Sequence, residues 1–205
     1  MLNIYHAPFT RAFRVIWLCE ELGIEYQLTR VDFSAEYRFS DEWRALNPVG
    51  KVPVMTDGEL TMFESGAMVQ YVLDRYGEGR MQPPAGTHAH AIYLQWSWFA
   101  EATFSRPVGE VVNHRRAFAG NESDAIMDEM ADRTMTCADA IEGALDGHDY
   151  LVSDAFSAAD IMVGYPLMLV DRVLRRDLPR RTAKYWAGLQ DREAFKATLA
   201  AQKNM

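Results

Sequence analysis

The chain has 205 residues, a formal net charge of −8 at pH 7, 49% hydrophobic residues and 24% charged residues. This composition is typical of a packed globular protein and argues against intrinsic disorder, and the length fits one large domain or two small ones. The negative charge is spread along the chain and no basic face appears, which argues against nucleic acid or an anionic membrane as a partner.

The first part of the chain alternates short β-type runs with helical patterns. Residues 2–5 and 26–31 predict two strands, and the apolar period between them predicts a helix that ends near Gly23. Residues 41–46 predict a short helix that must stop before Pro48, because the residue that precedes a proline disfavours the helical region.

The stretch NPVGKVPVM, residues 47–55, places Pro53 inside a β-type run. Proline has no N–H and cannot complete a central ladder, so it belongs at an edge, at a bulge or at the start of a strand. Two β runs around Asp57-Gly58 predict a hairpin, and residues 65–76 predict a helix. The order β-α-β-α-β-β-α describes a compact α/β domain.

The chain changes character near residue 80, where its composition becomes that of a linker. We expect an α/β domain at 1–78, a linker at 79–87 and an all-helical domain at 88–205. No convincing strand follows the linker. Shorter helical patterns follow Pro179, and the long amphipathic patterns run over 88–116, 124–146 and 157–173.

Four motifs occur in a specific order: NPVGKVPVM, the DG hairpin, FES at 63–65 and FSAAD at 156–160. With them, nearly the whole chain resembles the cytosolic glutathione S-transferase superfamily, and the motifs are similar to those of its bacterial theta-, beta- and nu-like members. The resemblance implies a thioredoxin-like βαβαββα domain that binds glutathione, followed by an all-helical bundle.

The resemblance implies that the Val52–Pro53 peptide bond is cis. Only about one X–Pro bond in twenty is cis in folded proteins, so the residues alone would favour a trans edge proline. It further implies that the backbone of Val52 pairs with the cysteinyl part of glutathione, as an added strand would. Lys51 is then expected to pair with the glycyl carboxylate, whereas on sequence alone it is more often a solvated charge.

The FES motif suits the γ-glutamyl end of glutathione, which carries an ammonium and a carboxylate. Ser65, at the start of a helix, offers a hydroxyl and backbone N–H groups to the carboxylate, and Glu64 can face the ammonium. The alternative is that Ser65 only caps the helix, which is the commoner use of serine there. The two roles are compatible.

In FSAAD, Ser157 and Asp160 have the spacing of a capping box. We assign this motif to folding and not to catalysis.

Glutathione chemistry needs a thiolate, and a free cysteine thiol has a pKa of about 8.5. In the superfamily a Tyr, Ser or Cys after the first strand donates a hydrogen bond to the sulfur. The equivalent segment here is YHAPFTRAF, in which Thr10 holds that place, so it is the expected donor and a possible cap of the following helix. Threonine is not the usual residue, so Tyr5, His6 and Arg11 remain alternatives.

A redox enzyme of the cysteine type is disfavoured, because it needs a thiol at the start of the first helix, and no C-x-x-C motif exists. Cys19 and Cys137 lie in apolar helical patterns and are interpreted as buried core residues. No disulfide framework is expected. With no apolar run of 18 residues and no leader pattern at Met1, we expect a soluble, cytoplasmic protein.

The electrophile is expected to bind beside the first helix of the bundle. Aromatic residues at helical spacing are usually core, so only one or two of Trp98, Phe99 and Phe104 should line this pocket. The histidines show no metal-ligand spacing, and we expect no metal. The residues assigned to the electrophile pocket are Phe9, Phe104, Ser105 and Arg106.

Two functions remain open from the sequence. The first is a glutathione transferase that acts on small hydrophobic electrophiles or peroxides, and the second is a non-catalytic dimerisation or interaction module. The intact glutathione motifs favour the enzyme, whereas Thr10 keeps the module open. The resemblance also implies a homodimer.

Overall fold

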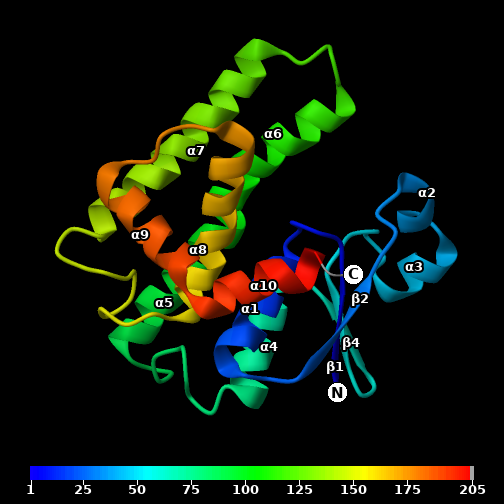
Figure 1. The fold of residues 1–205 in the computed structure, drawn as a ribbon, viewed down its shortest axis with the longest axis horizontal. Helices are drawn as coiled ribbons and strands as arrows, with labels where there is room; N and C mark the ends of the chain where they lie inside the picture. Colours follow the sequence, from blue (N-terminus) through cyan, green and yellow to red (C-terminus); the bar gives the residue numbers. More distant parts are fainter. Residues whose placement is uncertain (204–205) are drawn as a thin grey trace. The chain divides into compact units, whose positions relative to one another are not determined.

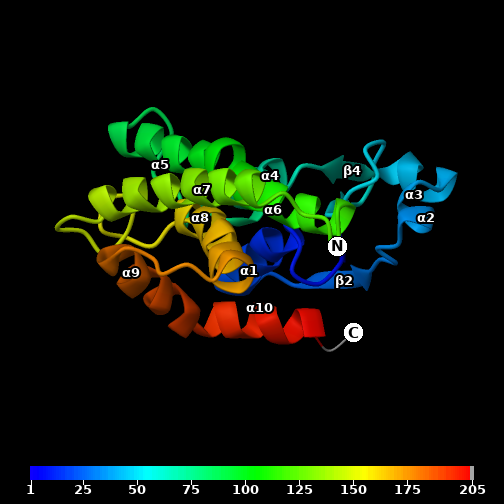
Figure 2. The same ribbon diagram turned by 90° about the horizontal axis from the view of Figure 1, so that it is seen from above.

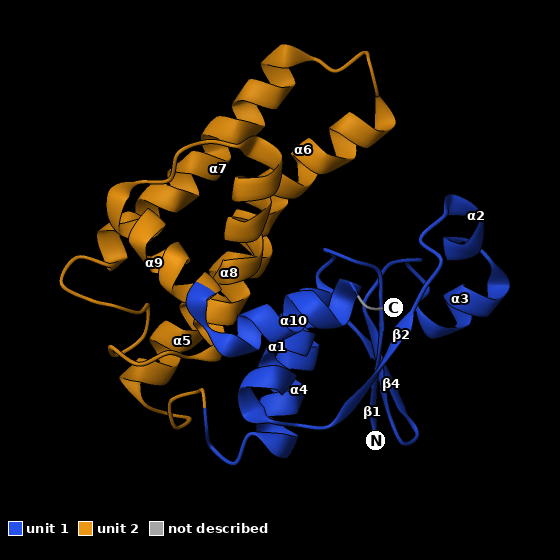
Figure 3. Cartoon of the chain, viewed as in Figure 1, with its two compact units in different colours: residues 1–80, 191–205 blue, residues 81–190 orange. Residues whose placement is uncertain are grey.

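The computed structural model describes residues 1–203, whose helices and strands are labelled in Figure 1. The chain divides into two compact units (Figure 3): residues 1–80 together with the C-terminal segment from residue 191, and residues 81–190. The sequence placed that C-terminal segment with the helical domain, whereas the structure groups it with the α/β unit.

The first unit contains a four-stranded mixed sheet with the order β2-β1-β3-β4. β1 runs parallel to β2 and antiparallel to β3, and β3 and β4 form an antiparallel hairpin. This is the thioredoxin-like arrangement that the motifs predicted. The strands are β1 (Leu2–His6), β2 (Tyr26–Arg30), β3 (Val54–Asp57) and β4 (Leu60–Phe63).

Three long helices, α1, α4 and α10, pack together in this unit, and α10 lies beside α1 in both views (Figures 1 and 2). Phe195 of α10 packs edge-on against Phe13 and Trp17 of α1, with ring centroids 5.2 and 5.0 Å apart. The helices of the unit are α1 (Ala12–Leu22), α2 (Ala35–Arg38), α3 (Asp41–Leu46), α4 (Ser65–Tyr76) and α10 (Glu193–Lys203).

A second, smaller core contains Trp43 of α3, which packs with Ala7, Val31, Val52 and Val54. This core joins the end of β1 to the segment before β3. The β1–α1 loop and the segment before β3, which are both candidate ligand-binding segments, therefore share Trp43 as a packing partner.

Several local predictions are confirmed and others need correction. α3 covers the predicted residues, and Gly23 ends α1 in the left-handed conformation, with φ 67°. The hairpin turn lies one residue later than predicted: Asp57 pairs with Leu60, so the loop is Gly58 and Glu59. Gly58 takes the left-handed position that such turns require, with φ 59°.

The short helix α2 was not predicted. Its four residues, Ala35–Arg38, are too few to show a periodic apolar pattern, and none of them is buried.

All the secondary-structure elements described in the second unit are helices, as predicted. The sequence read 88–116 and 157–173 as single helices, and the structure places a π-helical segment in each. A π-helical turn takes in one extra residue, but the segments on either side keep the α-helical period, so each pattern predicted a single helix. The elements are α5 (His88–Trp98), η1 (Phe99–Phe104), α6 (Ser105–Ala117), α7 (Asp124–Ala144), α8 (Ala158–Leu169), η2 (Val170–Leu174) and α9 (Arg180–Asp191).

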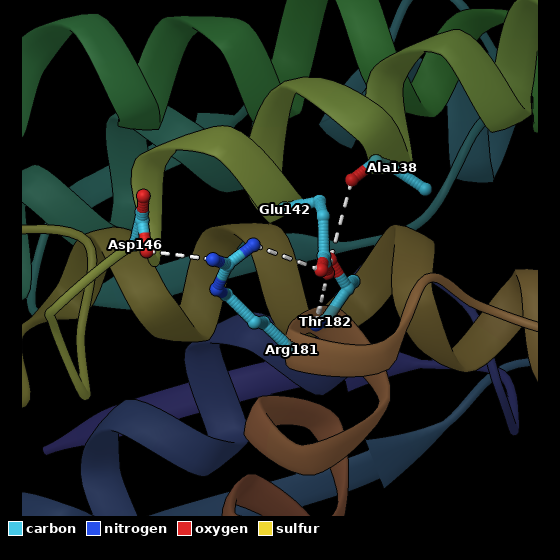
Figure 4. A network of polar contacts seen from close by, with 5 residues as sticks. All are labelled: Ala138, Glu142, Asp146, Arg181 and Thr182. Carbon is cyan, nitrogen blue, oxygen red and sulfur yellow. Dashed lines mark hydrogen bonds and ion pairs between the residues drawn. The ribbon is translucent and has the colours of Figure 1, made fainter.

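Polar contacts stabilise the start of α8 and join α7 to α9 in this unit. The predicted capping box at the start of α8 is present, with Ser157 and Asp160 bonded reciprocally. Glu142 of α7 accepts hydrogen bonds from the start of α9, where the backbone N–H of Thr182 lies 2.8 Å from Oε2 (Figure 4). Arg181 adds an ion pair with Asp146, at 2.6 Å.

In the described part of the chain, no helix is both long and apolar enough to cross a bilayer.

Candidate functional site

The loop between β1 and α1 contains the expected thiol donor. Phe9 is left-handed, with φ 60°, which is uncommon for a bulky residue. Its backbone N–H donates to Oε1 of Gln202 on α10, at 3.0 Å, so a residue 193 positions away fixes the loop. The Thr10 hydroxyl donates to the Ala7 carbonyl at 2.7 Å.

Thr10 does not cap α1. The helix begins at Ala12, its N-cap is Arg11, and no side chain caps it. The expected capping role of Thr10 is therefore wrong, because its hydroxyl proton is directed to the Ala7 carbonyl. The half-buried side chain keeps partial access to solvent.

The alternative donors Tyr5 and His6 point to opposite faces of β1. Tyr5 packs toward the small core, with its ring 6.0 Å from that of Trp43. His6 is fully buried, and neither ring nitrogen has a hydrogen-bond partner among the described residues. Burial, and then the charge of Arg30, lower the pKa of His6, so the ring is neutral near pH 7 and does not reach solvent.

The segment before β3 is ordered by Asn47, which is buried. Its amide nitrogen donates to the Lys51 carbonyl at 2.7 Å, and its amide oxygen accepts from the Val49 N–H at 3.0 Å. Gly50 is required here: φ is 65°, and a Cβ would lie 2.6 Å from the Arg38 carbonyl oxygen.

The Val52–Pro53 peptide bond is cis, which confirms that expectation. Val52 lies beyond the residues of β3 that pair with β1, since the ladder ends at Val54. Its backbone is therefore outside the sheet ladder. The side chain of Lys51 is exposed.

The FES motif lies at the start of α4. The N-cap is Glu64, which is exposed and left-handed with φ 78°, and Ser65 is the first helical residue. The prediction that Ser65 is the N-cap is therefore wrong by one position. Ser65 is buried, and its Oγ accepts a hydrogen bond from Nη1 of the buried Arg14 at 3.2 Å.

The four residues assigned to the electrophile pocket differ in exposure. Phe104 and Ser105 are buried, and the Ser105 hydroxyl donates to the Ala100 carbonyl at 2.6 Å. Phe9 is half-buried, and Arg106 is exposed at the edge of a cavity of about 540 Å³ in the helical unit. Of the aromatic residues on α5, Trp98 is 67% exposed.

Both cysteines are buried and free of disulfide bonds, as expected of core residues. Burial raises the pKa of Cys19 to about 12, which makes it a poor nucleophile. Among residues 1–203, no cluster of three His, Cys, Asp or Glu side chains is arranged to hold a metal ion.

Three residues near these segments were not predicted. Asn47 is the first residue of the NPVGKVPVM motif, to which the sequence assigned no role. Arg14 directly follows the YHAPFTRAF segment, and its signal was a charged residue within an apolar helical pattern. Gln202 gave no signal, because its partner lies at the other end of the chain.

Comparison with known proteins adds an independent finding. The family model for the glutathione S-transferase N-terminal domain matches residues 1–74. Glutathione S-transferase 4 of Zea mays is 30% identical over 200 residues, which cover 92% of this chain and 86% of that protein. Glutathione S-transferase 3 of Schizosaccharomyces pombe is 25% identical over 99% of this chain and 88% of its own length.

The fold also matches solved structures. A glutathione transferase from Phanerochaete chrysosporium, crystallised with oxidised glutathione, superposes with a TM-score of 0.89 at 23% identity, over 98% of this chain and 95% of that one. Poplar glutathione transferase F1 gives a TM-score of 0.88. These relatives are from plants and fungi, so the similarity to bacterial subgroups stays a prediction.

Proposed function

Because this chain belongs to the glutathione S-transferase superfamily, we propose that it is an enzyme that joins glutathione, through its sulfur, to small hydrophobic electrophiles. The observation that carries the proposal is that one compact unit contains all three segments that the reaction needs. These are the β1–α1 loop, the backbone before β3 and the N-terminus of α4.

Glutathione binds along these segments in our proposal. The γ-glutamyl carboxylate meets the Ser65 hydroxyl and the N–H groups of the first turn of α4, and the exposed Glu64 faces the ammonium. The Val52 backbone pairs with the cysteinyl part, and the exposed Lys51 pairs with the glycyl carboxylate.

The reaction begins when the bound thiol loses its proton. Lowering its pKa from about 8.5 to about 6.5 requires roughly 2.7 kcal/mol of preferential stabilisation of the thiolate. One hydrogen bond to a charged group supplies about 1.5–3 kcal/mol, and a helix N-terminus about 0.3–1 kcal/mol. We assign the hydrogen bond to Thr10, with Tyr5 and Arg11 as alternatives.

The thiolate then attacks an electrophilic carbon. A C–S bond forms, and the leaving group departs with its electron pair. Phe9, Phe104, Ser105 and Arg106 are the proposed residues of the electrophile site. With an organic hydroperoxide, two glutathione molecules would instead form the disulfide while the peroxide is reduced to alcohol and water.

The experiment incubates the full chain with glutathione and an activated chloronitroarene, and measures the thioether by absorbance and mass spectrometry. Enzyme-dependent, saturable thioether formation above the uncatalysed rate is the expected result. A parallel assay with an organic hydroperoxide measures glutathione disulfide. If calorimetry shows glutathione binding but neither product forms, the chain is the non-catalytic module instead.

The proposed assembly is a homodimer in the cytoplasm, without nucleic acid or membrane as a partner. Exposed apolar side chains support self-association: Trp98 and Leu94 are one helical turn apart on α5.

A further inference from the structure

Arg14 is a buried cation inside an apolar helix. It is 0% exposed, and its neighbours along α1, Phe13 and Val15, are hydrophobic core residues. A guanidinium is tolerated in such a place only where acceptors meet its N–H groups. Nη1 donates to Ser65 Oγ at 3.2 Å, across the packed helices α1 and α4.

This contact fixes which group is the donor. A guanidinium has no acceptor, so Ser65 must accept, and the bond occupies a lone pair of the hydroxyl. Within residues 1–203, Ser65 donates no hydrogen bond of its own. The hydroxyl therefore keeps its proton for another acceptor, and the bond from Arg14 polarises it toward donation.

The N-terminus of α4 surrounds that hydroxyl with further donors. Among the described residues no side chain caps the helix, and its first turn contains no acidic residue. The first N–H groups of a helix have no partner within the helix, and the helix dipole makes this end positive. A carboxylate could bind here, because it would accept hydrogen bonds from the Ser65 hydroxyl and the first N–H groups of α4, with the positive charge of Arg14 behind them.

We propose that Arg14 is a positioning residue for the γ-glutamyl carboxylate of glutathione. It does not touch the ligand: it orients and polarises the Ser65 hydroxyl, which makes the contact. This inference rests on the proposed function and deepens it, because it explains why an arginine occupies an apolar position of α1.

The test compares two ligands that differ only in that carboxylate. Glutathione and 4-aminobutyryl-cysteinyl-glycine, which lacks it, are titrated calorimetrically into the full chain and its variants. Arg14→Gln should weaken glutathione about tenfold or more, as expected for a hydrogen bond to a charged group, and change binding of the analogue by less than about twofold. Arg14→Lys, which keeps a charge but not the guanidinium fork, should give an intermediate loss.

The matched control is Arg75→Gln, which removes the same charge from an exposed residue at the other end of α4. It should bind both ligands as the parent does. Ser65→Ala and the double variant Arg14→Gln/Ser65→Ala complete a double-mutant cycle for glutathione binding. Because Arg14 acts through Ser65, the double variant should bind glutathione no more weakly than the weaker of the single variants.

An equal loss for both ligands, or no loss for either, would overturn the inference. If Arg14→Gln does not fold, the same ligand comparison with Arg14→Lys decides. A parent that binds glutathione and the analogue equally overturns the carboxylate site alone, whereas a parent that binds neither overturns the proposed function as well.

Discussion

At the scale of single residues, Thr10 is the side chain on which the proposed chemistry depends most. Its hydroxyl donates to the Ala7 carbonyl oxygen, with the two oxygens 2.7 Å apart. To serve the sulfur, the proton must turn from a neutral carbonyl oxygen to an anion. Hydrogen bonds to ionised acceptors are roughly twice as strong as neutral ones, so the thiolate itself favours this exchange.

Thr10→Ala should leave glutathione bound and raise the pKa of its thiol by about 1–2 units, because one charge-assisted hydrogen bond is lost. The ultraviolet absorbance of the thiolate, titrated against pH in the complex, measures this. Thr10→Ser is the matched control and should titrate like the parent, since it keeps the hydroxyl.

If Thr10→Ala titrates like the parent, the donor lies elsewhere. Tyr5→Phe and Arg11→Ala would then identify it by the same titration. Should the parent itself form no thiolate below about pH 8, the binding module would replace the enzyme as the better interpretation.

His6 should make the first unit sensitive to acid. The pKa of His6 in the folded protein is lowered from 6.5, chiefly by burial. Just below pH 6.5, His6 is therefore protonated in the unfolded chain and still neutral in the folded chain. The free energy of unfolding should therefore fall as the pH drops from 6.5 to the folded-state pKa. Urea unfolding at several pH values, for the parent and His6→Asn, measures this contribution.

The variant should lose less stability between pH 7 and pH 5 than the parent does. Identical pH dependence in the two proteins would mean that His6 is protonated in the folded state or gains a partner that compensates.

At the scale of elements, α10 helps to shape the β1–α1 loop. Phe195 packs its ring against α1, and Gln202 accepts the N–H of Phe9, which is held in the left-handed conformation. A left-handed bulky residue persists only when its surroundings determine it. α10 is thus a structural support of the loop that contains Thr10.

Gln202→Ala should remove the hydrogen bond from the Phe9 N–H to the Gln202 side chain, at a cost of about 0.5–1.5 kcal/mol, the net contribution of one such bond. Hydrogen exchange of that amide should accelerate, and kcat should fall more than KM rises, because the donor loop is displaced while the other glutathione contacts remain. Gln202→Glu keeps an acceptor oxygen and is the control. Unchanged exchange at Phe9 in Gln202→Ala would refute the role of α10.

The elements themselves were largely predictable, because each depends on local signals. α3 followed from DEWRAL before a proline, and the capping box at Ser157 followed from an aspartate three positions later. The turn after Asp57 was displaced by one residue because two adjacent positions suit it, and only pairing with Leu60 decides between them.

The candidate site was only partly predictable. Val52, Pro53, Glu64 and Ser65 lie in contiguous motifs, so the sequence alone is enough to propose them as glutathione-binding residues. The contacts that hold the candidate site in place are not local in sequence. Arg14 and Ser65 are 51 positions apart, and Gln202 and Phe9 are 193 positions apart. Such contacts depend on how the helices pack, which no local pattern records.

At the scale of the whole molecule, we expect a homodimer. Sedimentation equilibrium should give about 47 kDa, twice the 23.3 kDa of one chain. Trp98→Arg should lower this mass toward that of the monomer, because it places a charge on the most exposed aromatic of α5. Phe118→Arg, at the exposed end of α6, is the control and should remain dimeric. A monomeric parent at micromolar concentration would contradict the prediction.

The return of α10 to the first unit also determines when that unit can be completed during synthesis. Ribosomes add about 5–20 residues per second, so roughly 6–22 s separate the first segment of the unit from its last while residues 81–190 are made. In that interval, Phe13 and Trp17 lack the ring of Phe195, and the Phe9 amide lacks its acceptor. A nascent chain that has reached residue 80 would therefore present an apolar face of α1 to chaperones, and its β1–α1 loop would lack the contact from α10.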